Sequence, residues 1–186
     1  FESGKSAYPI KGISSISDVS VINVRGSGMV GKSGFSGRLF TLLAREQINV
    51  ILITQSSSEH SITFAVNPND SQKAVELIQN EFELELLANK LSMPVIEGDL
   101  SILAIVGENM KRTPGMSGKL FSALGRNGIN VRAIAQGSSE FNISVIINKE
   151  DLSKALNAVH DAFFAELKKT LHVFNVGTGN IGSRLF

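Results

Sequence analysis

The chain contains no cysteine among its 186 residues, which excludes disulfide bonds, thiolate zinc sites and cysteine nucleophiles. It also lacks any apolar run approaching the roughly 18 residues that a membrane-spanning helix requires. Its first residues do not follow the charged-then-apolar pattern of a signal peptide. We therefore expect a cytoplasmic protein with no membrane partner. Because the chain does not begin with methionine and stops within a motif, we also expect it to be part of a longer protein.

The chain has almost no net charge, because its 18 basic residues nearly balance its 17 acidic ones. Proteins that bind nucleic-acid backbones usually carry a clustered basic patch, so nucleic acid is not an expected partner. The three histidines are isolated and fit no metal-ligand spacing, and no nucleophile stands beside a base. We expect neither a metal site nor a catalytic residue in this chain. Its 42% apolar residues are typical of a globular protein with one large or two small domains.

An internal repeat is the strongest feature that is present. Residues 19–82 align with residues 100–163 without a gap, and more than a third of the aligned positions are identical. Two copies are too few for a solenoid, so the repeat indicates a duplicated domain. The predicted boundaries are 1–16 for a preceding segment, 17–98 and 99–176 for the two copies, and 177–186 for the start of another domain.

Each copy is predicted to follow the order βαββαβ, with a glycine-rich loop before its first helix. Asp70 and Asp151 are expected to cap the second helices. The second strand of the first copy, within 48–55, is a nearly continuous apolar run and is expected to be buried on both faces. The fourth strands are expected at 93–98 and 170–176. The predicted fold class is α+β, with tandem ferredoxin-like domains whose antiparallel sheets carry helices on one face and pair into one larger, eight-stranded sheet.

A polar pattern recurs after the second strand of each copy, reading Gln-x-Ser-Ser-Glu at 55–59 and at 136–140. Serine-rich segments of this kind are most often simple turns. A turn, however, does not require glutamine at the last strand position in both copies. The glycine-rich loop presents free backbone N–H groups at a helix N-terminus, which favours a carboxylate. A glutamine amide can both donate and accept hydrogen bonds, so loop and glutamine together predict a pocket for an amino acid.

The predicted fold order and these residues resemble the ACT domain, a small regulatory module that binds amino acids. The segments GMVGKSGFSGRLF, INVILITQSSSEHSI and GINVRAIAQGSSEFNISV are more specifically similar to the regulatory region of aspartokinases, and YPIKGISSI resembles the passage that leaves the kinase domain. Gln55 and Gln136 match the threonine-contacting glutamines of the threonine-sensitive branch. The resemblance thus implies feedback inhibition by L-threonine. Each copy is also expected to expose one sheet face and an edge, which like copies can bury by pairing, so we expect a homo-oligomer, most simply a dimer.

The last residues, LHVFNVGTGNIGSRLF, contain the glycine pattern Gly177, Gly179 and Gly182 after an expected strand. Alone this pattern is weak, and the chain stops before the rest of a dinucleotide-binding unit. Its position after a second ACT-like copy resembles a bifunctional aspartokinase–homoserine dehydrogenase. That resemblance implies ATP and NAD(P) as cofactors of the parent enzyme, while no cofactor is expected to bind within this chain.

The expected threonine contacts come from the loop, the start of the first helix, the entry of the second strand and its last residue. In the two copies they are Met29, Gly34, Phe35, Asn49 and Gln55, and Met110, Gly115, Met116, Asn130 and Gln136. Two substitutions between the copies, Gly31 to Arg112 and Ser56 to Gly137, indicate that the pockets need not be equivalent.

Three alternatives remain open on the sequence. RNA-recognition motifs share the βαββαβ order, but they stack bases on aromatic residues, whereas the central strands here carry aliphatic ones. A purely structural dimerisation module with empty pockets would show the same repeat. The regulatory region of a lysine-branch or methionine-branch aspartokinase would do so as well.

Overall fold

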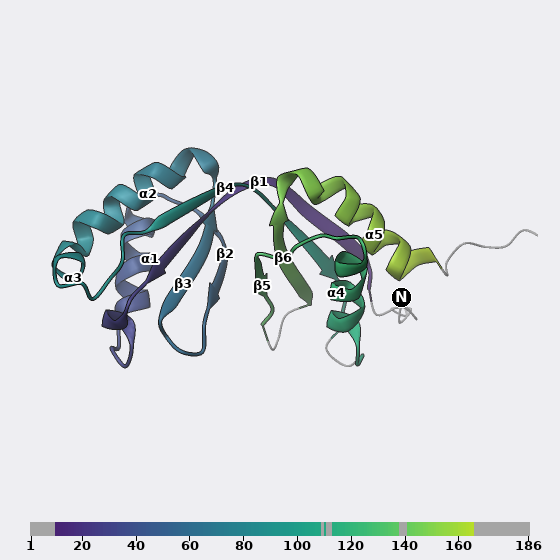
Figure 1. Cartoon of the computed structure of the whole chain (residues 1–186), viewed down its shortest axis with the longest axis horizontal. Helices are drawn as coiled ribbons and strands as arrows, with labels where there is room; N and C mark the ends of the chain where they lie inside the picture. Colours follow the sequence, from purple (N-terminus) through teal and green to yellow (C-terminus); the bar gives the residue numbers. More distant parts are fainter. Residues whose placement is uncertain (1–9, 109, 111–112, 138–140, 166–186) are drawn as a thin grey trace, which may run out of the picture.

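The computed structural model describes residues 10–108, 110, 113–137 and 141–165 (Figure 1). In the first copy of the repeat, hereafter the first unit, the elements are β1 (Gly12–Arg25), the 3-10 helix η1 (Ser27–Met29), α1 (Phe35–Arg45), β2 (Val50–Gln55), β3 (Ser61–Val66), α2 (Pro68–Glu81) and α3 (Glu83–Leu87). Those of the second unit are β4 (Val95–Val106), α4 (Met116–Arg126), β5 (Ala133–Ala135), β6 (Asn142–Asn148), the 3-10 helix η3 (Lys149–Asp151) and α5 (Leu152–Phe164).

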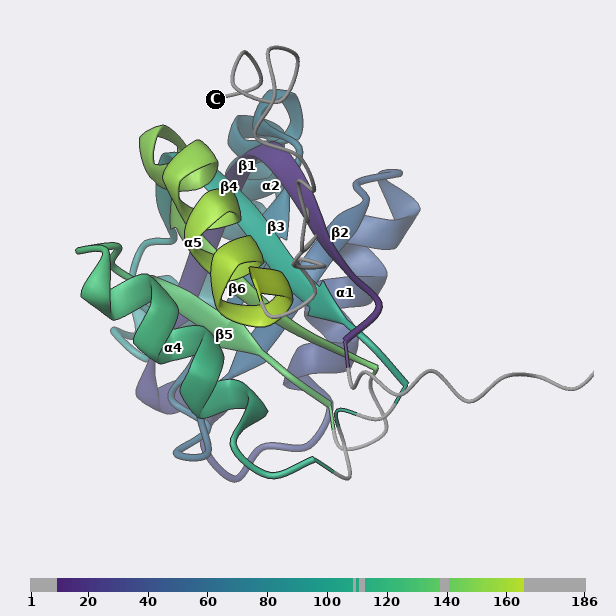
Figure 2. The same ribbon diagram turned by 90° about the vertical axis from the view of Figure 1, so that its right-hand side faces the viewer.

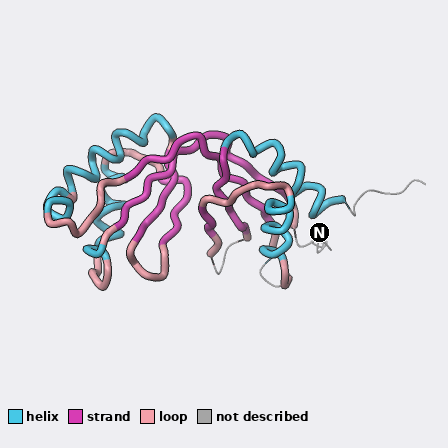
Figure 3. Tube along the Cα trace, viewed as in Figure 1, coloured by secondary structure: helices cyan, strands magenta, loops and turns pink. Residues whose placement is uncertain are grey.

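All strands of the described residues join one antiparallel sheet in the order β2-β3-β1-β4-β6-β5. The strands form the inner layer of an arch, and the helices cover its outer side on both arms (Figure 3). Turning the molecule shows α4 and α5 side by side over the sheet of the second unit (Figure 2). The predicted α+β class, with helices on one face of a shared antiparallel sheet, is confirmed.

The two longest strands, β1 and β4, each run through both units. The beginning of β1 pairs with the end of β4, where Gly12 lies opposite Val106. After irregularities between Ile16 and Val21, β1 continues between β3 and the beginning of β4. The first part of β1 therefore takes, in the second unit, the position that the start of β4 takes in the first.

This exchange explains why the described residues form six strands where eight were predicted. The segment 93–98, expected as a separate fourth strand, enters β4 at Val95 and continues into the first strand of the second unit. The strand expected at 170–176 lies outside the described residues.

Strand alternation divides the buried residues into three clusters. Ile22 and Val24 of β1 face the helices of the first unit, and Leu103 and Ile105 of β4 face those of the second. Along both strands, the residues that alternate with these point to the opposite, inner face of the sheet. There, side chains from both units form a third cluster, comprising Val19, Val21, Leu52, Ala65, Leu100, Ile102 and Ile146. The inner cluster joins the two units through apolar burial as well as through the shared strands.

The helix caps differ from the expectation in the first unit. Asn67, not Asp70, is the N-cap of α2, and its Oδ1 accepts a hydrogen bond from the N–H of Asn69 at 3.0 Å. Pro68 then occupies the first helical position, where its missing N–H costs nothing. Asp151 does occupy the N-cap position of α5, although its side chain makes no capping hydrogen bond.

The second strand of the first copy, β2, is not buried on both faces as predicted, and neither is its counterpart β5. Among the strands of the described residues, β2 and β5 stand at the two ends of the order, so each has one edge without a partner strand there. Ile53 and Ile134, which occupy equivalent positions, are 47% and 45% exposed. An apolar run cannot distinguish a central strand from an edge strand whose outward side chains meet another surface.

Candidate functional site

The predicted pocket of the first unit is present as a cavity at the start of α1. Gly34 caps this helix with φ of 90°, a left-handed conformation that favours glycine. Because α1 leads back to the entry of β2, the far end of β2 returns to the start of α1. Gln55 ends β2 there. The cavity has a volume of about 430 Å³ and is lined by Met29, Gly31, Lys32, Ser33, Gly34, Phe35, Ser36, Gln55, Glu59 and Ile62.

This loop cavity contains groups suited to both ends of an amino acid. The first N–H groups of α1 have no partner within the helix and favour an anion, and the ammonium of Lys32 adds a positive charge nearby. The carboxylate of Glu59 supplies the opposite charge. Its Oε2 accepts a hydrogen bond from the N–H of Gly31 at 2.9 Å, so the Gln-x-Ser-Ser-Glu turn is tied directly to the glycine-rich loop.

Four of the five residues predicted for the first pocket meet in this cavity, but Asn49 does not. Asn49 is exposed and precedes β2, whereas Gln55 ends it. The strand between them spans roughly 20 Å. Asn130 is likewise exposed ahead of β5. The expectation that these asparagines assist at the pocket is therefore corrected: they lie at the opposite end of the strand.

In the second unit, the described residues reproduce the same framework. Gly115 caps α4 with φ of 86°, as Gly34 caps α1. The hydroxyl of Ser117 donates to Oε1 of Gln136 at 3.4 Å, which places this glutamine at the start of α4. Met110 and Met116 are buried in the core of the second unit. The residues at 109, 111–112 and 138–140, which complete this loop and turn, lie outside the described part of the chain.

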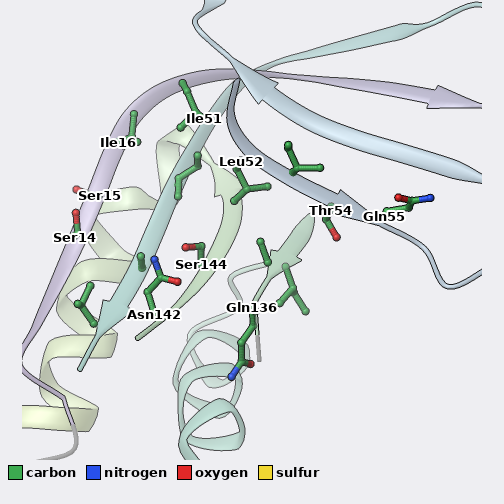
Figure 4. A pocket seen from close by; sticks show the side chains of 17 residues that line it. Ser14, Ser15, Ile16, Ile51, Leu52, Thr54, Gln55, Gln136, Asn142 and Ser144 are labelled. Atoms are coloured by element: carbon green, nitrogen blue, oxygen red, sulfur yellow. The ribbon is translucent and has the colours of Figure 1, made fainter. Parts of the chain in front are cut away.

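The two glutamines also share a second location that the sequence did not predict. Between the units, on the inner face of the sheet, lies a groove of about 680 Å³ (Figure 4). Gln55 reaches it from β2 and Gln136 from the segment after β5. Its other polar side chains are Ser14, Ser15, Thr54, Asn142 and Ser144. Gln55 thus stands in the wall between the loop cavity and the interface of the two units.

Sequence reasoning missed Lys32, Ser36 and Glu59 as lining residues of the loop cavity. Ser36 and Glu59 recur in the second copy as Ser117 and Glu140, and this recurrence is a signal that could have identified them. Lys32 has no such signal, because threonine occupies its place in the second copy. The glycines at 177, 179 and 182 lie outside the described residues.

Comparison with known proteins identifies the class to which this pair of units belongs. The family model described as the ACT domain matches residues 22–82 and residues 103–163, one match for each unit. The chain therefore belongs to the ACT domain family and carries two copies of the domain. The predicted ACT resemblance is confirmed.

The comparisons also narrow the family to aspartokinase regulatory regions. The chain superimposes on the ligand-free regulatory subunit of aspartate kinase from Thermus thermophilus with a TM-score of 0.69 and 30% identity, covering 83% of this chain and 99% of that one. For aspartate kinase from Synechocystis the TM-score is 0.76 at 28% identity, covering 90% of this chain and 29% of that one.

Among curated proteins, the chain is 42% identical to bifunctional aspartokinase/homoserine dehydrogenase 1, chloroplastic, from Arabidopsis thaliana, over 95% of this chain and 19% of that protein. It is 40% identical to the bifunctional aspartokinase/homoserine dehydrogenase of Haemophilus influenzae, over 95% of this chain and 22% of that one. The chain thus spans about a fifth of the length of these relatives.

Two searches of the described residues concern membranes and metals. None of the helices there is both long and apolar enough to cross a bilayer. Within the same residues, no group of three or more histidine, aspartate or glutamate side chains is arranged to hold a metal ion.

Proposed function

We propose that this chain is the amino-acid-sensing region of a bifunctional aspartokinase/homoserine dehydrogenase and that it binds L-threonine for feedback inhibition. The observation that carries the proposal is the meeting of Gln55 with the glycine-rich loop in one cavity. Its volume of about 430 Å³ lies within the range of small-molecule sites, about 300–1,000 Å³. The likeness to bifunctional relatives supports the identity of the parent protein.

In this proposal, the threonine carboxylate binds the N–H groups at the start of α1, and its ammonium lies near Glu59. The side chain of Gln55 contacts the bound amino acid from the end of β2. Gln136 does the same beside α4, so that the chain holds two threonine sites. An effector of this kind acts by binding one state of the parent enzyme better than another.

The catalytic steps belong to parts of the parent protein outside this chain. There, ATP would serve the kinase and NAD(P) the dehydrogenase, while the chain itself stays catalytically silent. We also propose that it assembles as a homodimer, because the free edge of β2 and its exposed Ile53 invite pairing with a second copy. Sedimentation that gives a monomer at tens of micromolar would contradict the dimer.

Calorimetric titration of the chain with L-threonine, L-lysine and L-methionine tests the effector. We expect heat from threonine and none from the other two. Binding of lysine or methionine alone would reassign the chain to another branch of aspartokinases. Silence from all three would show an empty dimerisation module.

A further inference from the structure

A second hollow lies between the units, on the inner face of the sheet toward its other end. It has a volume of about 300 Å³. Both units contribute to its wall, through Val21, Asn23, Thr54, Gln55, Ser56, Ser61, Thr63, Glu97, Leu100, Arg132, Ala133, Ile134 and Ile146. We call it the inter-unit hollow. It is separate from the loop cavity, although Gln55 borders both.

The strand register places the polar groups of this hollow together. Asn23 of β1 lies opposite Thr63 of β3, and Thr63 lies opposite Thr54 of β2, so these three form a row across the sheet. Glu97 of β4 lies opposite Val21 and is therefore the diagonal neighbour of Asn23. Diagonal neighbours on one face are about 7–8 Å apart, close enough for one small molecule to contact both.

Two opposite charges stand in the wall of the hollow. A terminal nitrogen of Arg132 donates to the carboxylate of Glu97, and the side chains are 42% and 39% exposed. Because both groups remain accessible, a ligand that carries both charges can contact them. Such partly exposed ion pairs contribute little to stability, so their rearrangement around a ligand costs little.

Asn23 adds an observation that points to a ligand. Its Oδ1 is buried and has no hydrogen-bond partner, the one such side-chain atom found in the described residues. A buried acceptor without a donor is unfavourable, and native structures rarely leave one unpaired. Asn23 lines the hollow, so a rotation of its amide would bring this oxygen to a bound molecule that carries an N–H donor.

The polar groups of the hollow are not inherited from the repeat. The equivalent of Asn23 is Ala104, and the equivalent of Arg132 is Ile51. Both of these apolar residues line the groove of about 680 Å³, which is the counterpart of this hollow. No charged residue lines that groove within the described part of the chain. The charged pair and the buried amide thus occur on one side of the pseudo-symmetric interface.

We propose that the inter-unit hollow is a further binding site for a small α-amino acid. The guanidinium of Arg132 binds the carboxylate, and the ammonium lies between Glu97 and Oδ1 of Asn23. The hydroxyls of Thr54 and Thr63 face the side chain of the ligand. This site stands on the chemistry of the hollow alone and does not depend on the loop cavities being threonine sites.

The test follows side-chain signals of the ¹⁵N-labelled chain by NMR during titration with glycine, L-threonine, L-aspartate, L-lysine and L-methionine. We expect at least one of them to shift the Asn23 amide and the Nε–H of Arg132. Glycolate lacks the ammonium of glycine and methylamine lacks its carboxylate, so each should bind at least about tenfold more weakly than glycine. If no amino acid moves these two signals, or if either analogue binds equally well, the proposal is wrong.

The repeat supplies matched variants. Asn23→Ala and Arg132→Ile each introduce the residue found at the same position of the other copy. Both should weaken binding in the hollow by about tenfold or more, whereas Ser36→Ala in the loop cavity should leave it unchanged. Wild-type affinity in both hollow variants would mean that the ion pair only joins the units. Threonine signals at the loop of α1, followed in the same titration, report on the proposed function separately.

Discussion

The two units share a framework but differ in the charges placed on it. In both, a glycine with positive φ caps the first helix, and a cation from that helix covers a phenylalanine. The cation is Arg38 over Phe82 at 4.2 Å in the first unit and Lys119 over Phe163 at 5.2 Å in the second. Backbone geometry, apolar packing and the glutamines Gln55 and Gln136 are thus common to both units, whereas Asn23 and Arg132 have apolar counterparts. The proposed threonine sites rest on the shared groups, and the proposed site in the inter-unit hollow rests on the groups that differ.

The largest effect is expected from substitutions in the apolar packing that the two units share. Leu39 and Leu120 hold the same position in the two units, and each is fully buried. Replacing either with alanine should cost about 2–5 kcal/mol of unfolding free energy. Because β1 and β4 belong to both units, we expect a single unfolding transition in denaturant for both variants. Leu84→Ala, at a position 78% exposed, is the control. Two separate transitions would show that the units fold independently.

The glutamines sharpen the comparison at the proposed threonine sites. Gln55→Ala and Gln136→Ala each remove hydrogen bonds to a bound zwitterion, a loss of about 1–3 kcal/mol, or roughly 5- to 150-fold in affinity. Calorimetry should show one weakened binding event in each variant, with an unchanged melting temperature. A lowered melting temperature with unchanged affinity would mean that both glutamines only support the turns.

The capping glycines test whether the framework is equivalent in the two units. Gly34 and Gly115 have positive φ, and a Cβ at either would meet no atom within 4 Å. Alanine should therefore cost only the left-handed backbone strain, about 1–2 kcal/mol, in both units. Gly37→Ala is the matched control. A Cβ there also has open space, and φ is not positive, so this helical position should gain about 0.5–1 kcal/mol. Unequal losses at Gly34 and Gly115 in chemical denaturation would break the equivalence.

The smallest expected effect concerns acid. Burial is the largest single influence on Glu85 and raises the pKa of its carboxyl. The hydrogen bond from Arg38 at 2.7 Å, a backbone hydrogen bond and the charges of Arg38 and Lys32 together outweigh burial and hold this pKa below its ordinary value. The ionised Glu85 carboxylate therefore stabilises the fold at pH values above the ordinary glutamate pKa of about 4.3. This stabilisation is lost as the pH falls toward the lower pKa of the folded state. Glu85→Gln should therefore lose less stability between neutral and acid pH than the wild type. Equal losses in thermal melts across that range would contradict this.

The sequence pattern predicted the helices and strands well because each element appears in two aligned copies, so each copy supports the assignment made in the other. Helical spacing located α1 and α4, and β-branched runs located the strands. The break expected after Gly98 has a physical basis, since Asp99 has φ of 54° within β4. The chain nevertheless resumes the strand, because its next residues pair with β6. A local signal cannot reveal whether a strand continues after an irregularity.

The candidate site was predictable only where contacts are local to one copy. The glycine-rich loop, the helix start and Gln55 meet through βαβ connectivity, which the element order implies. Asn49 does not join the site because the extended strand β2 separates it from Gln55. The inter-unit hollow escaped prediction because Asn23, Glu97 and Arg132 come together only through the packing of one unit on the other.

The shared strands determine where this protein can be divided. Boundaries drawn at residues 17 and 99 fall inside β1 and β4. A chain cut at either point would separate each unit from the strand segment that completes its sheet, because the start of β1 belongs to the second unit and the start of β4 to the first. The pair is consequently inseparable by truncation, recombination or domain shuffling. Because β1 and β4 run through both units, we expect any rotation of one unit against the other to strain the pairing of these two strands.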